Sequence, residues 1–338
     1  MSFYQSKFDK VKPQDKKTNF ILTEDQITKV RTFFQDALCK NLNLRRVSAP
    51  LMVTSSSGFN DDLNGTERKI KIDLKTGPTT TIVHSLAKWK RHALKKYNFD
   101  MYSGLYTNMN ALRIDEDLSN IHSYYVDQWD WEKVIKEEDR NIEYLKKTVK
   151  DIYKSLKETD FLIRSEYQEL THKLPEDIQF IFTQDLEDEY PDLDPKEREY
   201  ECVKKHKAVF LMKIGGVLRS GTRHDGRAPD YDDWELNGDI LLYNELLDIP
   251  YEISSMGIRV SKESLMRQLE EAGALDRTSL KFHSMLLNDE LPFTIGGGIG
   301  QSRVCMFLLD KLHIGEVQVS EWDEKTKKYC ATRNINLL

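Results

Sequence analysis

One stretch of the chain carries polar side chains where a buried strand would carry apolar ones. Its alternate positions are occupied by Val126, Gln128, Asp130 and Glu132. Consecutive residues of a strand point to opposite faces, so these four side chains share one side of a sheet. Three successive polar groups do not form a core, and Arg113 ends the preceding strand candidate opposite them. The pattern predicts the floor of a binding site.

A second strand candidate, residues 251–260, also has a mixed face. Glu252, Ser254 and Met256 alternate along it, and Arg259 lies near its end. Strand geometry predicts that Glu252 and Ser254 point to the same side of the sheet. A carboxylate and a hydroxyl on one face indicate a second wall of the binding site.

The run Gly296–Gly300 invites comparison with phosphate-binding loops. No Gly-Lys-Ser/Thr follows it, so it is not a Walker loop, and the glutamine at position 301 breaks the dinucleotide pattern. Such a run can simply be a tight packing site at a strand end. Arg303 favours a ligand, because it sets a fixed cation beside backbone that a ligand can approach closely.

Two other stretches carry charge. Residues 230–233 resemble the start of a calcium loop, but Trp234 breaks the pattern, so they form either a solvated acidic turn or carboxylates that face a cation or amine. Residues 84–91 read as a basic helix start, or as a solvated face with Trp89 packed inward. The sequence contains no HExxH and no GxSxG, which argues against a catalytic zinc and against a serine hydrolase elbow.

The elements that must position these residues follow from periodicity. Apolar residues at helical spacing predict a helix over 24–43, with Thr23 and Gln26 as a capping box. Further helices are expected over 86–97, 138–170 (with an interruption) and 301–312, and strands over 45–53, 69–73, 79–83, 104–113, 122–131, 179–182, 208–213, 239–243 and 251–260. Because the strands come in groups, we expect an α+β fold with a mixed, mostly antiparallel sheet flanked by helices. Residues 21–338 should form one domain after a flexible arm over 1–20.

Composition excludes several classes of protein. The 338 residues include 50 basic and 56 acidic side chains, a net charge of −6 that argues against a dedicated nucleic-acid binder. No apolar run approaches the roughly 20 residues of a membrane span. The first twenty residues lack the apolar segment of a secretory signal, and the 4 cysteines form no CxxC. We therefore expect a cytoplasmic protein with neither nucleic-acid nor membrane partners.

Together these motifs resemble the catalytic core of class II aminoacyl-tRNA synthetases, especially the aspartyl enzymes. The matching segments are 45–50 (first motif), 113–115 with 126–132 (second motif), 252–259 (the Glu…Gly-Ser-Ile-Arg strand) and 298–306 (third motif). One departure is Val126, which stands where the tRNA ligases carry the Phe that stacks on adenine.

A closer resemblance is to the class II-like family of ammonia-dependent asparagine synthetases, or aspartate–ammonia ligases. It rests on the runs 62–65, 84–91, 125–132, 223–234, 254–259 and 296–303, and it extends from about residue 24 to the C-terminus. The resemblance implies that ATP, L-aspartate and ammonia give L-asparagine, AMP and pyrophosphate through a β-aspartyl-adenylate. It also implies a homodimer that pairs through Glu24–Pro50.

The resemblance further implies a set of residues for ATP. Arg113 would hold the α-phosphate and Arg303 the γ-phosphate, since arginine suits bidentate phosphate contacts. Asp239 and Glu252 would bind Mg²⁺. The whole nucleotide set is Arg113, Asp115, His122, Asp239, Glu252, Gly298 and Arg303.

For aspartate the β-carboxylate must react, so we infer that Lys90 and Arg259 clamp the α-carboxylate. The acceptors for its ammonium group are Gln128, Asp130 and Ser255, and Ser85, Asp232 and Ser254 complete the substrate set. Ammonia arrives mostly as ammonium, so a carboxylate must take its proton. The family run places that carboxylate at Asp61 rather than Asp62, with Asp232 as the second candidate, and Asp61, Arg113, Gln128 and Arg303 form the catalytic set.

Two other functions remain open from the sequence. The chain could be a truncated aspartyl- or asparaginyl-tRNA ligase, which a tRNA-charging assay would reveal. It could also be a non-catalytic relative that binds an amino acid and regulates a partner. Aspartate-dependent ATP–pyrophosphate exchange separates that relative from an enzyme.

Overall fold

The computed structural model describes residues 3–14, 19–60 and 67–338. Among these residues, eight strands form one sheet in the order β1-β5-β6-β11-β10-β9-β8-β7. Their bounds, in that order, are Leu44–Arg46, Gly104–Leu112, Tyr125–Val134, Thr294–Gly300, Ile249–Arg259, Asp232–Asn244, Ala208–Met212 and Gln179–Phe182. Neighbours are antiparallel except at the two edges, where β1 pairs with β5 and β7 with β8 in parallel. The α+β fold with a mixed, mostly antiparallel sheet is therefore confirmed.

A small second sheet lies beside the large one, with strand order β2-β4-β3. Its strands are Met52–Thr54, Thr80–Ile82 and Lys71–Ile72 in that order. The single strand expected over 45–53 is wrong, because its two ends belong to different sheets. The chain leaves the large sheet after Arg46, passes through Pro50 and pairs again only as β2.

The main helices are α1 Phe3–Phe8, α2 Phe20–Leu42, α3 Ala87–Lys96, α4 Ile142–Glu166, α5 Thr183–Glu189, α6 Pro195–His206, α7 Lys262–Glu271, α8 Lys281–Leu287, α9 Gln301–Leu308 and α10 Glu324–Thr332. Helix α4 is continuous rather than interrupted. Helix α2 begins earlier than its pattern predicted, because the Asn19 side chain caps it by accepting from the Leu22 amide at 3.1 Å. No helix in the described part of the chain is both long and apolar enough to cross a membrane.

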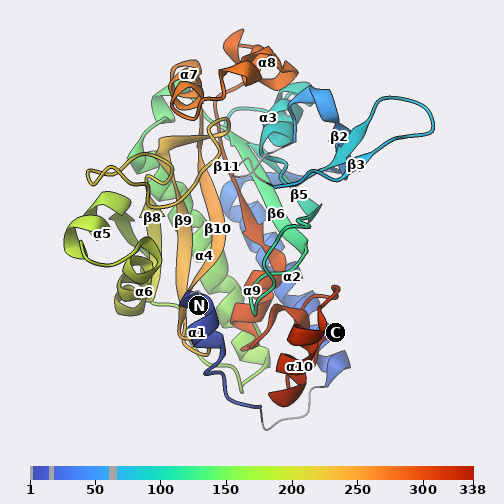
Figure 1. Ribbon diagram of the computed structural model, residues 1–338, viewed down its shortest axis with the longest axis vertical. Coiled ribbons are helices and arrows are strands. Elements are labelled where there is room, and N and C mark those ends of the chain that lie inside the picture. The colour runs from blue at the N-terminus through green and yellow to red at the C-terminus, as the bar shows by residue number, and fades with distance from the viewer. Residues whose placement is uncertain (1–2, 15–18, 61–66) are drawn as a thin grey trace.

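Helices α2 and α4 pack together against one face of the large sheet (Figure 1). Trp129 and Trp131 of β6 point into the core between the sheet and these helices. The intervening residues, Gln128 and Asp130, point to the opposite face, where they line a pocket. The alternation predicted for this strand is confirmed, because one face of β6 serves the core and the other a site.

The N-terminal residues differ from the flexible arm that their lysines suggested. Residues 3–8 form α1, and Phe8 and Val11 are buried in the main core. Apolar side chains spaced among the lysines explain this docking, because Phe3 and Tyr4 also pack against the core. Residues 3–14 are therefore packed as part of the domain and do not form a flexible arm.

Candidate active site

A pocket of about 500 Å³ opens on the face of the sheet that α2 and α4 leave uncovered. Strands β6, β10 and β11 form its floor. The loop between β5 and β6, the loop before β9 and the start of α3 form its walls. It brings together most of the expected site residues: Ser85, Lys90, Arg113, Asp115, His122, Gln128, Asp130, Asp232, Asp239, Glu252, Ser255, Arg259, Gly298 and Arg303.

The glycine run of β11 lets side chains from the neighbouring strands lie flat across it. A Cβ on Gly296 would overlap the carboxylate of Glu132, and one on Gly298 would overlap the amide of Gln128. The packing reading of these glycines is therefore correct. It also serves the site, because Gln128 can lie on the pocket floor only where β11 has no side chain.

One end of the pocket holds a buried pair between Lys90 and Asp130. The Lys90 ammonium donates to Asp130 and, at 3.0 Å each, to the carbonyls of Trp131 and Gly297. Burial lowers the pKa of Lys90, although Asp130 opposes that shift. Its three N–H groups all have acceptors among the described residues, so the amine orients Asp130 instead of offering a donor to a ligand.

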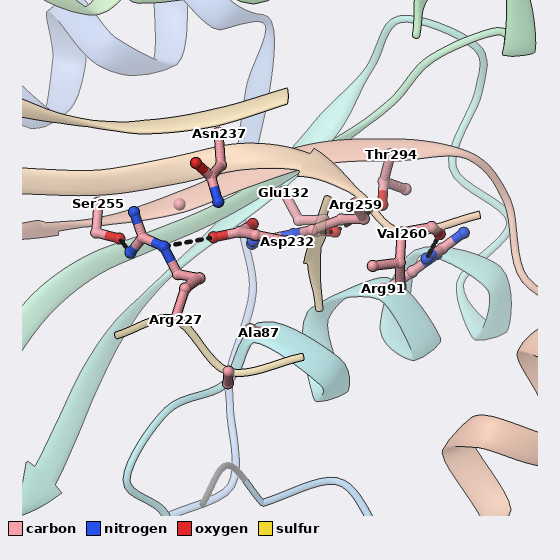
Figure 2. A network of polar contacts seen from close by, with 12 residues as sticks. Ala87, Arg91, Glu132, Arg227, Asp232, Asn237, Ser255, Arg259, Val260 and Thr294 are labelled. Carbon is pink, nitrogen blue, oxygen red and sulfur yellow. Dashed lines mark hydrogen bonds and ion pairs between the residues drawn. The ribbon is translucent and has the colours of Figure 1, made fainter. Parts of the chain in front are cut away.

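Arg259 lies beside this pair and is held from two sides. Its guanidinium donates to both oxygens of Glu132, with the shortest contact 2.7 Å, and to Asp232. Thr294 donates a further bond of 2.7 Å to Glu132. Burial alone would raise the pKa of Glu132, but Arg259 holds it below its usual value. Figure 2 shows Glu132 and Asp232 on either side of the guanidinium.

Arg227 is the principal residue of the site that sequence reasoning left without a role. Its guanidinium donates to the Ser255 hydroxyl (Figure 2). It also donates to Asp239 at 2.7 Å. Its Nε lies 4.0 Å from Asp232 and is buried without a hydrogen-bond partner among the described residues. The sequence feature that could have pointed to Arg227 is its position in the family motif 223–234, just before the acidic stretch 230–233.

The loop that carries Arg227 is anchored by Asp230, which is completely buried. Its carboxylate accepts from Lys88 of α3 at 3.0 Å and lies 2.9 Å from Nε2 of His283 in α8. The acidic stretch 230–233 is thus neither a solvated turn nor a calcium loop. Its carboxylates pair with protein cations and hold Arg227 in the pocket.

The other end of the pocket is cationic. Arg113 and Arg303 both line it, and Arg303 donates to the Glu252 carbonyl at 2.8 Å. Nε of Arg113 is buried without a partner among the described residues. His122 lies between these charges, and burial together with Arg303 and Arg113 lowers its pKa to about 3, so the imidazole is neutral. Two cations around a neutral ring form a site suited to a polyanion.

The start of α9, which carries Arg303, is fixed by Asp127 of β6. This carboxylate accepts from the Ser302 amide at 3.1 Å and from the Ser302 hydroxyl at 2.8 Å. Arg31 of α2 donates to the same carboxylate at 2.8 Å. Through Asp127, helix α2 on the core side is therefore connected to the start of α9, which carries Arg303 at the pocket.

Asp239 and Glu252 form a pair of carboxylates between the two ends. Burial, assisted by the charge of Glu252, raises the pKa of Asp239 to about 6 against the opposing effect of Arg227. Two adjacent carboxylates that repel each other would be stabilised by a cation. Among residues 3–14, 19–60 and 67–338, no group of three or more His, Cys, Asp and Glu could hold a metal. The oxygen atoms of the pair suit a hard cation, which would need further ligands from outside the protein.

The structure contradicts the alternation that was predicted for Ser254. Ser254 does not line the pocket; its hydroxyl is buried and has no partner among the described residues. A bulge between Glu252 and Ser254 shifts the alternation, so Ser255 shares the pocket with Glu252. Asp115 lines the outer rim, where Arg68 lowers its pKa. Asp61 and Asp62 lie outside the described residues.

Comparison with known proteins identifies the family. The family model described as aspartate-ammonia ligase matches residues 21–334. A protein of Fusobacterium nucleatum named aspartate–ammonia ligase is 60% identical over 316 residues, which cover 94% of this chain and 97% of that protein. A protein of the same name from Lactobacillus johnsonii is 59% identical and covers 94% of this chain and 95% of its own length.

Solved structures show the same fold at low identity. The asparaginyl-tRNA synthetase of Pyrococcus horikoshii, in complex with asparaginyl-adenylate, superposes with a TM-score of 0.63 and 14% identity, covering 88% of this chain and 68% of that one. The asparaginyl-tRNA synthetase of Entamoeba histolytica gives a TM-score of 0.62 at 11% identity. The class II synthetase fold is therefore confirmed, and the full-length matches show that the chain belongs to the aspartate–ammonia ligase family.

Proposed function

We propose that this pocket carries out the ATP-dependent amidation of L-aspartate by ammonia, with release of AMP and pyrophosphate. The observation that carries the proposal is the division of one pocket into two ends. Arg113 and Arg303 form a cationic end for a triphosphate, and the Lys90–Asp130 and Arg259–Asp232 pairs form a dipolar end for an amino acid. Arg227 lies between the two ends, where the reacting atoms would meet.

In the first step the β-carboxylate of aspartate attacks the α-phosphorus of ATP. A P–O bond forms to the carboxylate, and the bond to pyrophosphate breaks with its electron pair on the leaving group. Arg113 would neutralise charge on the α-phosphate and Arg303 on the leaving end, which is where preorganised cations lower the barrier. Mg²⁺ held by Asp239 and Glu252 would neutralise further phosphate charge. Gly298 is half-buried but lines the pocket, and without a side chain it would let the nucleotide approach β11 closely beside Gln128.

At the amino-acid end, the donors and acceptors determine how aspartate lies. The aspartate ammonium would bind Asp130, with Gln128 and Ser255 as further acceptors, since Asp130 has one carboxylate oxygen without a partner among the described residues. Its α-carboxylate would face Arg259. Because Lys90 has its donors satisfied, we assign it to orienting Asp130.

In the second step ammonia attacks the acyl carbon of the β-aspartyl-adenylate, and AMP leaves. Ammonium must first lose one proton, for which Asp61 remains our proposal and Asp232 the alternative. Asp232 lines the pocket but is paired with Arg259 and lies close to Arg227. Because the Asp232 carboxylate is already engaged by Arg259, we prefer Asp61.

The experiment is aspartate-dependent exchange of labelled pyrophosphate into ATP, followed by asparagine formation on addition of ammonium. We expect pyrophosphate exchange when aspartate is present, even though no tRNA is added. Asparagine should form only when ammonium is present. Absence of exchange with active, folded protein would overturn the proposal. Charging of tRNA with aspartate or asparagine would instead support the truncated-ligase reading.

We further propose a cytoplasmic homodimer that pairs through Glu24–Pro50, with no nucleic-acid or membrane partner. Exposed apolar side chains just outside the two ends of this segment, Ile21 and Leu51, support pairing because such residues gain by burial. Sedimentation equilibrium should give about twice the mass of the chain, 39.6 kDa. A stable and fully active species of one chain would contradict it.

A further inference from the structure

We propose that the N-terminal segment, residues 3–14, supports the phosphate end of the nucleotide site from outside the pocket, and that Tyr4 positions the His122 imidazole there. The proposal rests on the assignment of Arg113 and Arg303 to ATP made above. The family model begins only at residue 21, so this segment lies outside it.

The segment is held in place by the C-terminal residues. The Tyr329 hydroxyl donates to the Phe8 carbonyl at 2.8 Å. Arg333 donates to the carbonyls of Val11 and Asp9 at 3.2 Å each, and the Gln14 amide donates back to the Arg333 carbonyl at 2.9 Å. These hydrogen bonds hold the backbone of residues 8–14 against the C-terminal residues, so this part of the segment is not a loose tail.

A second anchor fixes the orientation of α1. Lys7 donates to Asp248 at 2.5 Å and stands 3.9 Å from the centre of the Tyr200 ring. The hydroxyls of Tyr200 and Tyr243 donate to the same carboxylate at 2.8 and 2.6 Å. These bonds hold the pKa of Asp248 at about 2 against burial, so the carboxylate stays charged and the anchor stays closed at neutral pH.

This docking places Tyr4 behind His122, outside the lining of the pocket. Its ring meets the ring of His122 edge to face, with centroids 6.4 Å apart, and His122 lines the pocket between Arg113 and Arg303. Burial raises the pKa of the Tyr4 phenol to about 12, with smaller effects from nearby charges that include Glu252 and Arg303. Tyr4 thus stands behind the phosphate end of the site, on the side away from the ligand.

The loop that carries His122 and the segment that carries Tyr4 share one support. Tyr329 of α10, which binds the Phe8 carbonyl, also accepts from Asn120 at 3.1 Å. Nδ1 of His122 lies 2.8 Å from the Ser119 hydroxyl, so the imidazole is set by its own loop on one side and by Tyr4 on the other. Removing Tyr4 would leave this side of the ring without support and let it turn away from the phosphates.

The test compares four single variants of the full chain. Tyr4→Ala removes the ring that packs on His122, Tyr4→Phe retains the ring, and Lys7→Met releases the anchor of α1. Lys10→Ala is the matched control, because Lys10 is exposed on the same segment. The measured quantities are KM for ATP and KM for aspartate in pyrophosphate exchange, together with the melting temperature of each variant.

We expect Tyr4→Ala to raise KM for ATP about three- to tenfold, as loss of one aromatic contact would, while KM for aspartate stays within about twofold. Lys7→Met should shift KM for ATP in the same direction. Tyr4→Phe should behave like the unchanged protein, because the ring and not the hydroxyl supports His122. This rescue and the split between the two KM values are not expected of a general loss of stability.

The inference is overturned if KM for ATP in Tyr4→Ala and Lys7→Met matches that of Lys10→Ala. It is also overturned if both KM values rise together with a fall in melting temperature. Should Tyr4→Ala not fold, Lys7→Met and Tyr4→Phe decide. Failure of exchange in the unchanged protein would instead refute the proposed function, so the two failures are distinguishable.

Discussion

Replacing Arg227 by methionine is expected to reduce pyrophosphate exchange strongly. Arg227 lines the pocket and makes one charged hydrogen bond to Asp239 at 2.7 Å, and its buried Nε has no hydrogen-bond partner among the described residues. A hydrogen bond to a charged group contributes about 1.5–3 kcal/mol. Loss of the bond to Asp239 and of one bond to the ligand removes about 3–6 kcal/mol, or roughly 10² to 10⁴ in kcat/KM for aspartate.

The same variant should change the pH profile. Burial and Glu252 raise the pKa of Asp239 to about 6, and Arg227 opposes them. Without Arg227 this pKa rises further, so more of Asp239 is protonated near neutral pH and unable to bind a cation. The acid limb of kcat/KM, measured at limiting magnesium, should therefore move to higher pH.

Arg223→Met provides the matched control. Arg223 lies on the same loop but pairs with Glu271 at the surface at 2.7 Å, outside the pocket. An exposed pair of this kind contributes about 0–1 kcal/mol, so exchange should change less than about fivefold. The reasoning is refuted if Arg227→Met stays within about threefold of the unchanged protein, or if the two variants lose exchange equally.

The other predictions concern single residues of the site. Asp61→Asn should retain exchange but aminate the adenylate slowly, by a factor of roughly 10² to 10⁴, with partial rescue at high pH where free ammonia is abundant; a parallel loss of both activities would argue for substrate binding instead. Arg303→Ala should raise KM for ATP by the equivalent of about 2–3 kcal/mol with aspartate binding unchanged, and an unaltered KM would reject its phosphate contact. Ser255→Ala should raise KM for aspartate while Ser254→Ala does not, because only Ser255 lines the pocket; the reverse order would contradict the bulge in β10. Glu132→Gln should lower the free energy of unfolding by about 3–5 kcal/mol in urea denaturation, because it breaks a buried ion pair. The pKa of Glu132 is lowered in the folded state, so its contribution is complete above the unfolded value of about 4.3 and the difference between variant and unchanged protein should shrink as the pH falls below it.

Local sequence patterns determined the chemistry of the pocket floor. The alternation along β6 required only that the segment be a strand, since side chains then alternate with a period of two. Trp129 and Trp131 on one face and Gln128 and Asp130 on the other follow from it. The motifs were similarly local, so the fold class and the family could be predicted from runs of adjacent residues.

The position of a side chain across a bulge could not be predicted in this way. Ser254 and Ser255 are adjacent in sequence and of the same type, and which of them faces the pocket depends on one extra residue in the pairing of β10 with β9. Such a bulge depends on how two strands fit together, which neither strand shows by itself.

Partnerships between distant residues also required the tertiary structure. Arg227 and Asp239 belong to different elements and meet only in the folded chain. In the same way, the sequence around Lys90 does not show that its three N–H groups bind Asp130 and the carbonyls of Trp131 and Gly297. The N-terminal segment is the clearest case. Its lysines resemble those of a solvated tail, but residues more than 300 positions away bind its backbone, as the Tyr329 contact with Phe8 shows at a separation of 321. Sequence periodicity reports which face of an element is apolar, whereas the partner of that face is decided only when the whole chain has folded.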